Sequence, residues 1–444
     1  MVLQSVKHRL INVTILAVSM IVLASCASTR SPQEEVSAED SPMLNRIDLR
    51  RPDAPELAGR GDYQVGVRTV SLTNPDQLDV LSVVEGDEEA RYDRELTVET
   101  WYPANTDGAA PSVYDVTARD GSQVQLIGTA VRDAEARSDG GGYPLVIISH
   151  GYPGNRYLLS HFGEFLASHG YVVASIDHRE STYSDQAAFG STLRNRALDQ
   201  LFVLDEIARL SDGEDPKVDV ATDEHMADPR FLAGLVDADR SAILGYSMGA
   251  YGALNATGAG LSDTIGDLDF APETVFEGRR ASDDSYTDSL DSRVQAVVSI
   301  APWGKQLGVF DEDGLAGVEA PTMFMAGSVD DVSGYENGTR AAFEELTNAE
   351  RLLLTFENAN HNAAAPMPAP QEVFESGEGY DHYSDPVWDT VRMNNIAQHF
   401  VAAFLASELK GETDMRDYLE PGEFAGFPDR TTAGLRLEYL AEGE

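Results

Sequence analysis

The segment Gly245-Tyr246-Ser247-Met248-Gly249 has the residue types and spacing that can present a serine nucleophile. The apolar run 242–244 precedes it, and the small residues of 250–256 after it suit a closely packed helix. Between a strand and a helix, Gly-x-Ser-x-Gly forms a sharp turn that lifts the hydroxyl to where a base can reach it. Side chains at the two glycines would crowd such a turn. The pattern therefore predicts that Ser247 is a nucleophile.

A serine nucleophile needs a base, and the base needs an acid that holds its tautomer. Asp330 comes just after the apolar run 322–326, and His361 comes shortly after the apolar run 352–356. If both runs are parallel strands, their carboxyl ends meet the serine at one edge of a sheet. The order of the residues therefore predicts a Ser247, His361 and Asp330 triad, with Asp331 as the alternative acid.

Acyl transfer also needs donors for the oxyanion of the tetrahedral intermediate. One expected donor is the backbone N–H of the residue after the nucleophile, Met248. The second is expected from the loop after the strand 145–149, where the sequence reads His150-Gly151-Tyr152. We expect the Tyr152 amide to be this donor and His150 to support the loop, because no nucleophile adjoins that histidine.

Alternating strand and helix patterns predict the elements that position these residues. The expected α/β fold has a mostly parallel central sheet flanked by helices, in a catalytic domain over 61–410 that is followed by a polar tail over 411–444. Two acidic insertions are expected near 211–235 and 258–292. The predicted strands are 63–72, 96–102, 145–149, 171–176, 242–244, 294–300, 322–326 and 352–356, with 107–142 a strand pair or long loop; the predicted helices are 157–169, 193–210, 250–256 and 397–409.

Several motifs resemble known families. Ser149-His150-Gly151, the segment 165–174 and Asp177-His178-Arg179 resemble the platelet-activating-factor acetylhydrolase branch of α/β-hydrolases and the dienelactone-hydrolase-like proteins of bacteria. That resemblance implies the α/β-hydrolase fold and hydrolysis of small or lipid-like esters. The elbow and Ala301-Pro302-Trp303 resemble bacterial cutinases and polyester hydrolases. This second resemblance implies that Tyr246, Tyr152 and Trp303 wall the ester cleft.

The chain departs from both acetylhydrolase-like patterns. Dienelactone hydrolases carry a cysteine nucleophile where this chain has Ser247. The acetylhydrolase branch takes its acid after the strand that matches 294–300, where this chain has Ala301, so the acid is expected one strand later, at Asp330. A peptidase of the same fold and a catalytically silent scaffold are the alternative functions.

The N-terminus predicts a membrane anchor. Residues 1–25 read as a signal peptide, and Leu23-Ala24-Ser25-Cys26 resembles the lipobox of bacterial lipoproteins. The resemblance implies a lipidated Cys26, followed by a flexible tether over 26–60. Because Ala27 follows the cysteine, the family's sorting rule implies the outer membrane of a bacterial cell envelope.

The charge and the cysteine content exclude several classes of partner. A net charge of −43, from 75 acidic and 32 basic residues, repels nucleic acid and anionic membranes and is typical of a salty medium. The single cysteine excludes internal disulfides and cysteine-based metal sites. The sequence has no nucleotide motif or metal-ligand cluster, so neither a cofactor nor a metal is expected. The expected partners are an ester substrate and, through the lipid anchor, a membrane.

Overall fold

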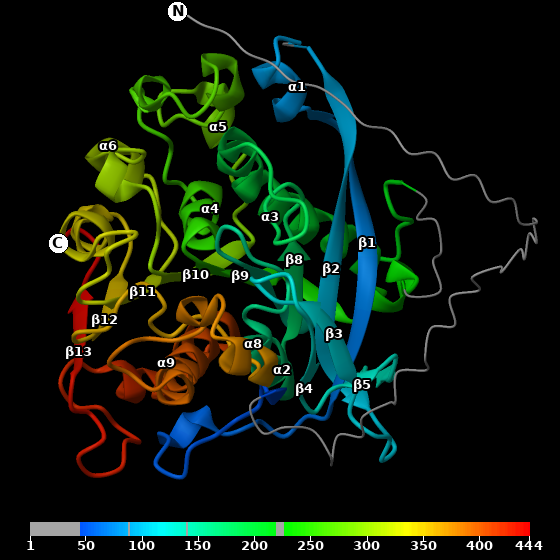
Figure 1. Ribbon diagram of the computed structural model, residues 1–444, viewed down its shortest axis with the longest axis vertical. Helices are drawn as coiled ribbons and strands as arrows, with labels where there is room; N and C mark the ends of the chain where they lie inside the picture. Colours follow the sequence, from blue (N-terminus) through cyan, green and yellow to red (C-terminus); the bar gives the residue numbers. More distant parts are fainter. Residues whose placement is uncertain (1–44, 88, 139–140, 219–225) are drawn as a thin grey trace, which may run out of the picture. The chain divides into compact units, whose positions relative to one another are not determined.

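The computed structural model describes residues 45–87, 89–138, 141–218 and 226–444. Within them, eleven strands form one mixed sheet, and β3 (Val113–Thr117) and β4 (Gln123–Ile127) form a separate hairpin (Figure 1). The predicted signal peptide, Cys26 and the first part of the predicted tether lie outside the described residues. No helix in the described part of the chain is long and apolar enough to cross a membrane.

The central sheet is mostly parallel, as the sequence predicts. The strands from β12 through β11, β10, β9 and β7 to β8 all run parallel, and antiparallel strands flank them on both sides. In spatial order the strands are β13 (Leu435–Leu440), β12 (Arg351–Phe356), β11 (Thr322–Gly327), β10 (Val294–Ile300), β9 (Val236–Tyr246), β7 (Tyr143–Ser149), β8 (Val172–Asp177), β2 (Arg91–Asn105), β1 (Val65–Leu78) and β5 (Val131–Arg132), with β6 (Glu135–Ala136) paired to β2.

Helices cover both faces of this sheet. In Figure 1, α3 and α4 lie above the sheet and α2 and α9 lie below it. The described helices are α1 (Val80–Val84), α2 (Ser160–Ser168), α3 (Phe189–Ser211), α4 (Met248–Ala256), α5 (Asp284–Thr287), α6 (Glu312–Leu315), α7 (Ala341–Glu345), α8 (Gln371–Ser376) and α9 (Thr390–Lys410).

The two faces of the sheet bury separate cores. Along β7, Val146 and Ile148 join the core under α2 and α9, whereas Leu145 and Ile147 join the core under α3. Successive side chains of a strand point to opposite faces, so a strand covered on both sides is apolar at every position. This is why the apolar runs predict five of the six parallel strands to within two residues. The exception is β9, which begins at Val236, six residues before the predicted run 242–244, because its first residues include Asp237, Asp239 and Arg240.

Helix starts differ more from the prediction. The closing helix was expected from Ala397, yet α9 begins at Thr390, because the Asp389 side chain caps it by accepting from the Arg392 amide. The first turns of this helix include the half-buried Thr390 and Arg392 and the buried Asn394 and Asn395, and these polar residues hide the start from an apolar pattern.

The predicted polar tail is part of the sheet. Residues 411–444 contain β13, which pairs antiparallel with β12 and buries Leu437. Its outward residues Arg436 and Glu438 form an ion pair, and charged side chains are typical of edge strands. These charges made the segment read as a tail, so the prediction for 411–444 was wrong.

The described part of the predicted tether also packs on the domain. Ile47 is buried, and its amide donates to the Ile127 carbonyl at 2.9 Å. Asn395 on α9 accepts from the Arg51 amide and donates to the Leu49 carbonyl. Residues 45–60 are therefore bound to the domain, which corrects the predicted tether over that range.

Candidate active site

Ser247 lies on the sharp turn between β9 and α4. Its φ of 54° and ψ of −114° are a combination that residues with side chains rarely adopt, and such strain is held by the surroundings at functional sites. The Ser247 amide donates to the Ile300 carbonyl of β10 at 2.9 Å. A Cβ on Gly245 would collide with the Gly249 backbone, and one on Gly249 with the Ser149 carbonyl. The turn therefore has the geometry that the sequence predicts.

The structure brings together the three residues of the predicted triad. His361 Nε2 lies 3.0 Å from Ser247 Oγ, and His361 Nδ1 lies 3.0 and 3.1 Å from the two carboxylate oxygens of Asp330. A carboxylate only accepts hydrogen bonds, so it holds the imidazole proton on Nδ1 and leaves Nε2 free to accept the serine proton. The arrangement can therefore activate the Ser247 hydroxyl.

The structure separates the two candidate acids. Asp330 is buried and its Oδ1 also accepts from the amides of Val332 and Ser333, each at 2.9 Å. Asp331 is exposed, and in the described part of the chain its side chain forms no hydrogen bond or ion pair with His361. The carboxylate that faces His361 is therefore that of Asp330, at the end of β11 as expected.

The predicted oxyanion donors lie beside the serine. Met248 is the first residue of α4, where a helix leaves its amides without intrahelical acceptors. The loop with Tyr152 approaches closely, because a Cβ on Gly151 would lie 3.5 Å from Ser247 Cβ. Among the described residues, neither the Tyr152 amide nor the Met248 amide has a hydrogen-bond acceptor. Both amides are thus available to a developing oxyanion.

A cavity of about 820 Å³ opens over Ser247 and His361. Tyr152 and Tyr246 form part of its wall, as expected, and the segment 380–386 supplies much of the rest. Much of the lining is polar or charged. It consists of Arg119, Gly151, Tyr152, Tyr246, Ser247, Asp331, Val332, Asn360, His361, Asn362, Tyr380, Asp381, His382, Ser384, Asp385 and Pro386.

Tyr246 and Trp303 differ in their relation to this cavity. The Tyr246 ring lies 5.2 Å from the His361 ring, and its hydroxyl donates to Asn362 Oδ1 at 2.8 Å. The Trp303 ring packs in an aromatic cluster with Phe189, and the described residues that line the cavity do not include it. Instead, the Trp303 amide donates to the Ser247 carbonyl at 3.3 Å. The backbone of Trp303, rather than its ring, contacts the site.

Burial controls the protonation of the groups around the cavity. Desolvation lowers the pKa of His382 to about 3, with a smaller contribution from the charge of Arg119. Desolvation also raises the pKa of Tyr246 far above its usual value. At neutral pH, His382 is therefore uncharged, and Tyr246 keeps the proton that it donates to Asn362.

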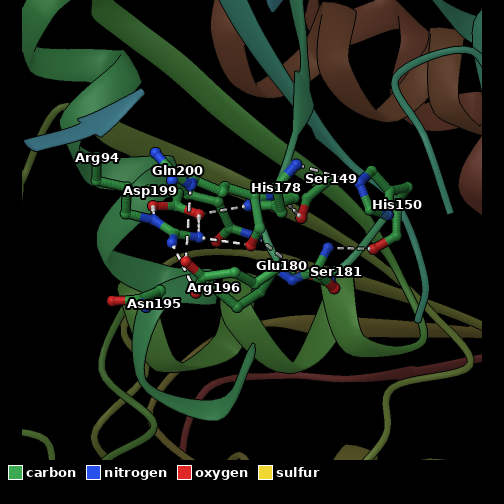
Figure 2. A network of polar contacts seen from close by, with 12 residues as sticks. Arg94, Ser149, His150, His178, Glu180, Ser181, Asn195, Arg196, Asp199 and Gln200 are labelled. Carbon is green, nitrogen blue, oxygen red and sulfur yellow. Dashed lines mark hydrogen bonds and ion pairs between the residues drawn. The ribbon is translucent and has the colours of Figure 1, made fainter. Parts of the chain in front are cut away.

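A second Ser–His–Asp arrangement lies beneath the oxyanion loop, by which we mean residues 150–152 after β7 (Figure 2). Ser149 Oγ is 2.8 Å from His178 Nε2, and His178 Nδ1 is 2.9 Å from Asp199 Oδ2. All three side chains are at most 1% exposed, whereas Ser247 is 7% exposed and faces the cavity. Substrate can therefore reach Ser247 and not Ser149.

The loop histidine has the supporting position that the sequence predicts. His150 Nδ1 lies 2.7 Å from the Gly151 carbonyl oxygen, and His150 Nε2 accepts from the His178 amide at 3.3 Å. Sequence reasoning missed its neighbours Arg196 and Asp199 on α3. The Asp-His-Arg motif at 177–179 pointed to this region. No sequence pattern, however, marks a residue of α3 that forms hydrogen bonds with a loop far away in the chain.

A protein-family model matches the region that contains this loop. The model of the family "platelet-activating factor acetylhydrolase, isoform II" matches residues 122–199. The platelet-activating factor acetylhydrolase of Bos taurus is 32% identical over 136 residues, which are 24% of this chain and 30% of that protein. The enzyme of Cavia porcellus is 42% identical over 59 residues, 12% of this chain and 14% of its own length. The matched segments thus span less than a third of these relatives.

The family match covers the oxyanion loop and the buried arrangement around His178, and it ends before Ser247. A ferulic acid esterase from Streptomyces cinnamoneus superposes with a TM-score of 0.55 and 20% identity, over 87% of this chain and 99% of that one. The chain therefore has the α/β-hydrolase fold, and over residues 122–199 it resembles the platelet-activating factor acetylhydrolases.

Proposed function

We propose that this protein hydrolyses carboxylic esters through an acyl-enzyme formed on Ser247. The observation that carries the proposal is the line of contacts from Ser247 through His361 to Asp330, with each step near 3.0 Å, at the floor of an open cavity. Nucleophile, base and orienting acid at hydrogen-bonding distance are the requirements for this chemistry.

The reaction proceeds in two steps. His361 Nε2 takes the Ser247 proton as Oγ attacks the ester carbonyl, and then gives the proton to the leaving alcohol. The amides of Tyr152 and Met248 stabilise the oxyanion, while Asp330 stabilises the imidazolium. In the second step His361 activates a water molecule, which attacks the acyl group and releases the acid and the free serine.

Small or lipid-like esters are the proposed substrates. The family whose model matches residues 122–199 and the similar curated proteins are named acetylhydrolases, and the structural neighbour is named an esterase. The cavity volume of about 820 Å³ is within the range that holds a drug-sized molecule. Because Arg119, Asp331 and Asp381 lie on its wall, the cavity also suits a substrate that carries polar groups.

Trapping and a substrate panel test the proposal together. A fluorophosphonate should label the peptide that contains Ser247 and leave the peptide with Ser149 unlabelled. Ser247→Ala should abolish both labelling and hydrolysis of p-nitrophenyl acetate. An acyl series from acetate to octanoate, run beside peptide anilides, separates an esterase from a peptidase. Hydrolysis that survives in Ser247→Ala, or cleavage of the anilides alone, would contradict the proposal.

A further inference from the structure

We infer that Arg196 and His150 are positioning residues for the oxyanion hole, because they hold the Gly151 carbonyl and so direct the Tyr152 amide toward Ser247. The inference rests on the proposed function and names residues that set the efficiency of the same site. Neither side chain is among the described residues that line the cavity, so any effect on catalysis must act through the loop that contains Gly151 and Tyr152.

The planarity of the peptide bond carries the argument. The Gly151 carbonyl accepts from His150 Nδ1 at 2.7 Å and from Arg196 Nη2 at 3.5 Å, and the His150 carbonyl accepts from Arg196 Nη1 at 2.6 Å. In a planar trans peptide, the carbonyl of one residue and the N–H of the next point in opposite directions. Fixing the Gly151 carbonyl therefore fixes the direction of the Tyr152 N–H.

His150 can donate because its tautomer is determined. The backbone amide of His178 donates to His150 Nε2, so the single proton of the neutral ring must be on Nδ1, which faces the Gly151 carbonyl. The ring is fully buried, and desolvation, helped by the nearby Arg196 charge, keeps the pKa of His150 well below its usual value. The ring therefore stays neutral and keeps this donor.

Arg196 is held in place by the buried polar network of Figure 2. Its guanidinium donates to Ser181 Oγ as well as to the loop, and a Cβ on Gly252 of α4 would collide with its stem. Asp199, one turn along α3, is engaged by Arg94 through two hydrogen bonds of 2.7 and 3.0 Å. A buried arginine with several fixed partners cannot easily shift, so the loop has a rigid support.

The other half of the oxyanion hole does not depend on side chains. The Ser247 carbonyl, which shares a peptide plane with the Met248 amide, accepts from the amides of Tyr251 and Trp303 at 2.9 and 3.3 Å. Backbone groups therefore orient the amide of Met248, whereas side chains orient the amide of Tyr152. Only the Tyr152 half can be weakened by substituting a residue outside the cavity.

Two matched pairs of variants test the inference. Asn places its amide near the position of histidine Nδ1, so His150→Asn can keep the donor to Gly151, whereas His150→Gln moves the donor away. Arg196→Met removes every donor and keeps the stem, whereas Arg196→Lys keeps one donor and the charge. We expect kcat to fall about 10- to 100-fold in His150→Gln and Arg196→Met with little change in KM, and much less in the two conservative variants. Outright loss of an oxyanion donor costs about 10²- to 10³-fold.

A spectroscopic measurement separates positioning from a general loss of structure. A trifluoromethyl ketone labelled with ¹³C at its carbonyl forms a hemiketal with the reactive serine, and the pKa of the hemiketal hydroxyl reports the strength of the oxyanion hole. We expect this pKa to rise in His150→Gln and Arg196→Met. Arg279→Met is the control, because Arg279 is another buried arginine, bonded to Asn255 at the far end of α4.

Each outcome decides one of the two claims. If the unaltered protein forms no hemiketal on Ser247, the proposed function fails. If it does, and the hemiketal pKa and kcat of folded His150→Gln equal those of His150→Asn, the inference fails. The histidine pair decides the matter even where Arg196→Met does not fold, since both histidine variants remove the same ring.

Discussion

Both carboxylate oxygens of Asp330 face Nδ1 of His361, at 3.0 and 3.1 Å. We expect Asp330→Asn to lower kcat by about 10⁴-fold, because an amide at this position can donate and so favours the wrong imidazole tautomer. Steady-state kinetics with p-nitrophenyl acetate measure the loss.

Asp331→Asn is the matched control for that variant. It removes the same charge one residue away, on an exposed side chain that, among the described interactions, forms no hydrogen bond or ion pair with His361. Its kcat should stay within a few-fold of the unaltered protein. Greater sensitivity of Asp331 than of Asp330 would show that the wrong acid has been assigned.

Acid should destabilise the fold partly through His161. This side chain is 3% exposed, and burial lowers its pKa to about 3. The unfolded chain takes up the proton near pH 6.5 while the native state does not, so stability falls as the pH falls from about 6.5 toward 3. The expected slope is about 1.4 kcal/mol per pH unit for this one group.

His161→Leu should remove that slope. The free energy of unfolding, from urea titrations between pH 7 and pH 5, should fall less steeply in this variant than in the unaltered protein. Leu159→Met changes neighbouring packing without a titrating group and should leave the slope as it was. Equal slopes in all three proteins would contradict the assignment.

Salt should stabilise the protein. A net charge of −43 means that the acidic groups repel one another in dilute buffer, and added ions screen this repulsion. We expect Tm to rise as NaCl increases from about 0.05 M to about 1 M, where the screening length falls to about 3 Å. KCl should act equally, because screening depends on ionic strength. A flat or falling Tm would remove the argument for adaptation to a salty medium.

We propose that Cys26 carries the lipid anchor and that the protein resides in a bacterial cell envelope, on the basis of the lipobox-like Leu23-Ala24-Ser25-Cys26. Cys26→Ala should abolish incorporation of labelled palmitate and shift the protein out of the membrane fraction. Ser25→Ala, which keeps the cysteine, is the control and should still be lipidated. Native protein with an intact Met1 and no lipid would refute the anchor.

Much of the site could be predicted because it depends on local patterns. Gly245 and Gly249 mark the elbow, since no other residue fits there, and apolar runs mark strands that are covered on both faces. Chain order then places Asp330 and His361 after successive strands, and parallel strands bring their carboxyl ends to one edge. Residues with such local signatures were placed correctly from the sequence alone.

Other features depended on contacts between distant segments. The charged residues of β13 are typical of a polar tail when the sequence is considered alone. The strand forms because it pairs with β12, which buries Leu437 and leaves Arg436 and Glu438 on the outside. Trp303 was expected to act through its ring, but the packing on Phe189 leaves only its amide at the site.

By itself, the sequence determined the fold class, the elbow serine and the residues in line with it, because strand periodicity and turn sterics are properties of neighbouring residues. The sequence favoured Asp330 over Asp331, but only the tertiary structure shows why the two differ: the Asp330 carboxylate is buried against His361, whereas Asp331 is exposed. Only the tertiary structure shows that Arg196 of α3 donates to the carbonyl of His150, because a hydrogen bond between residues 46 positions apart leaves no pattern in either segment.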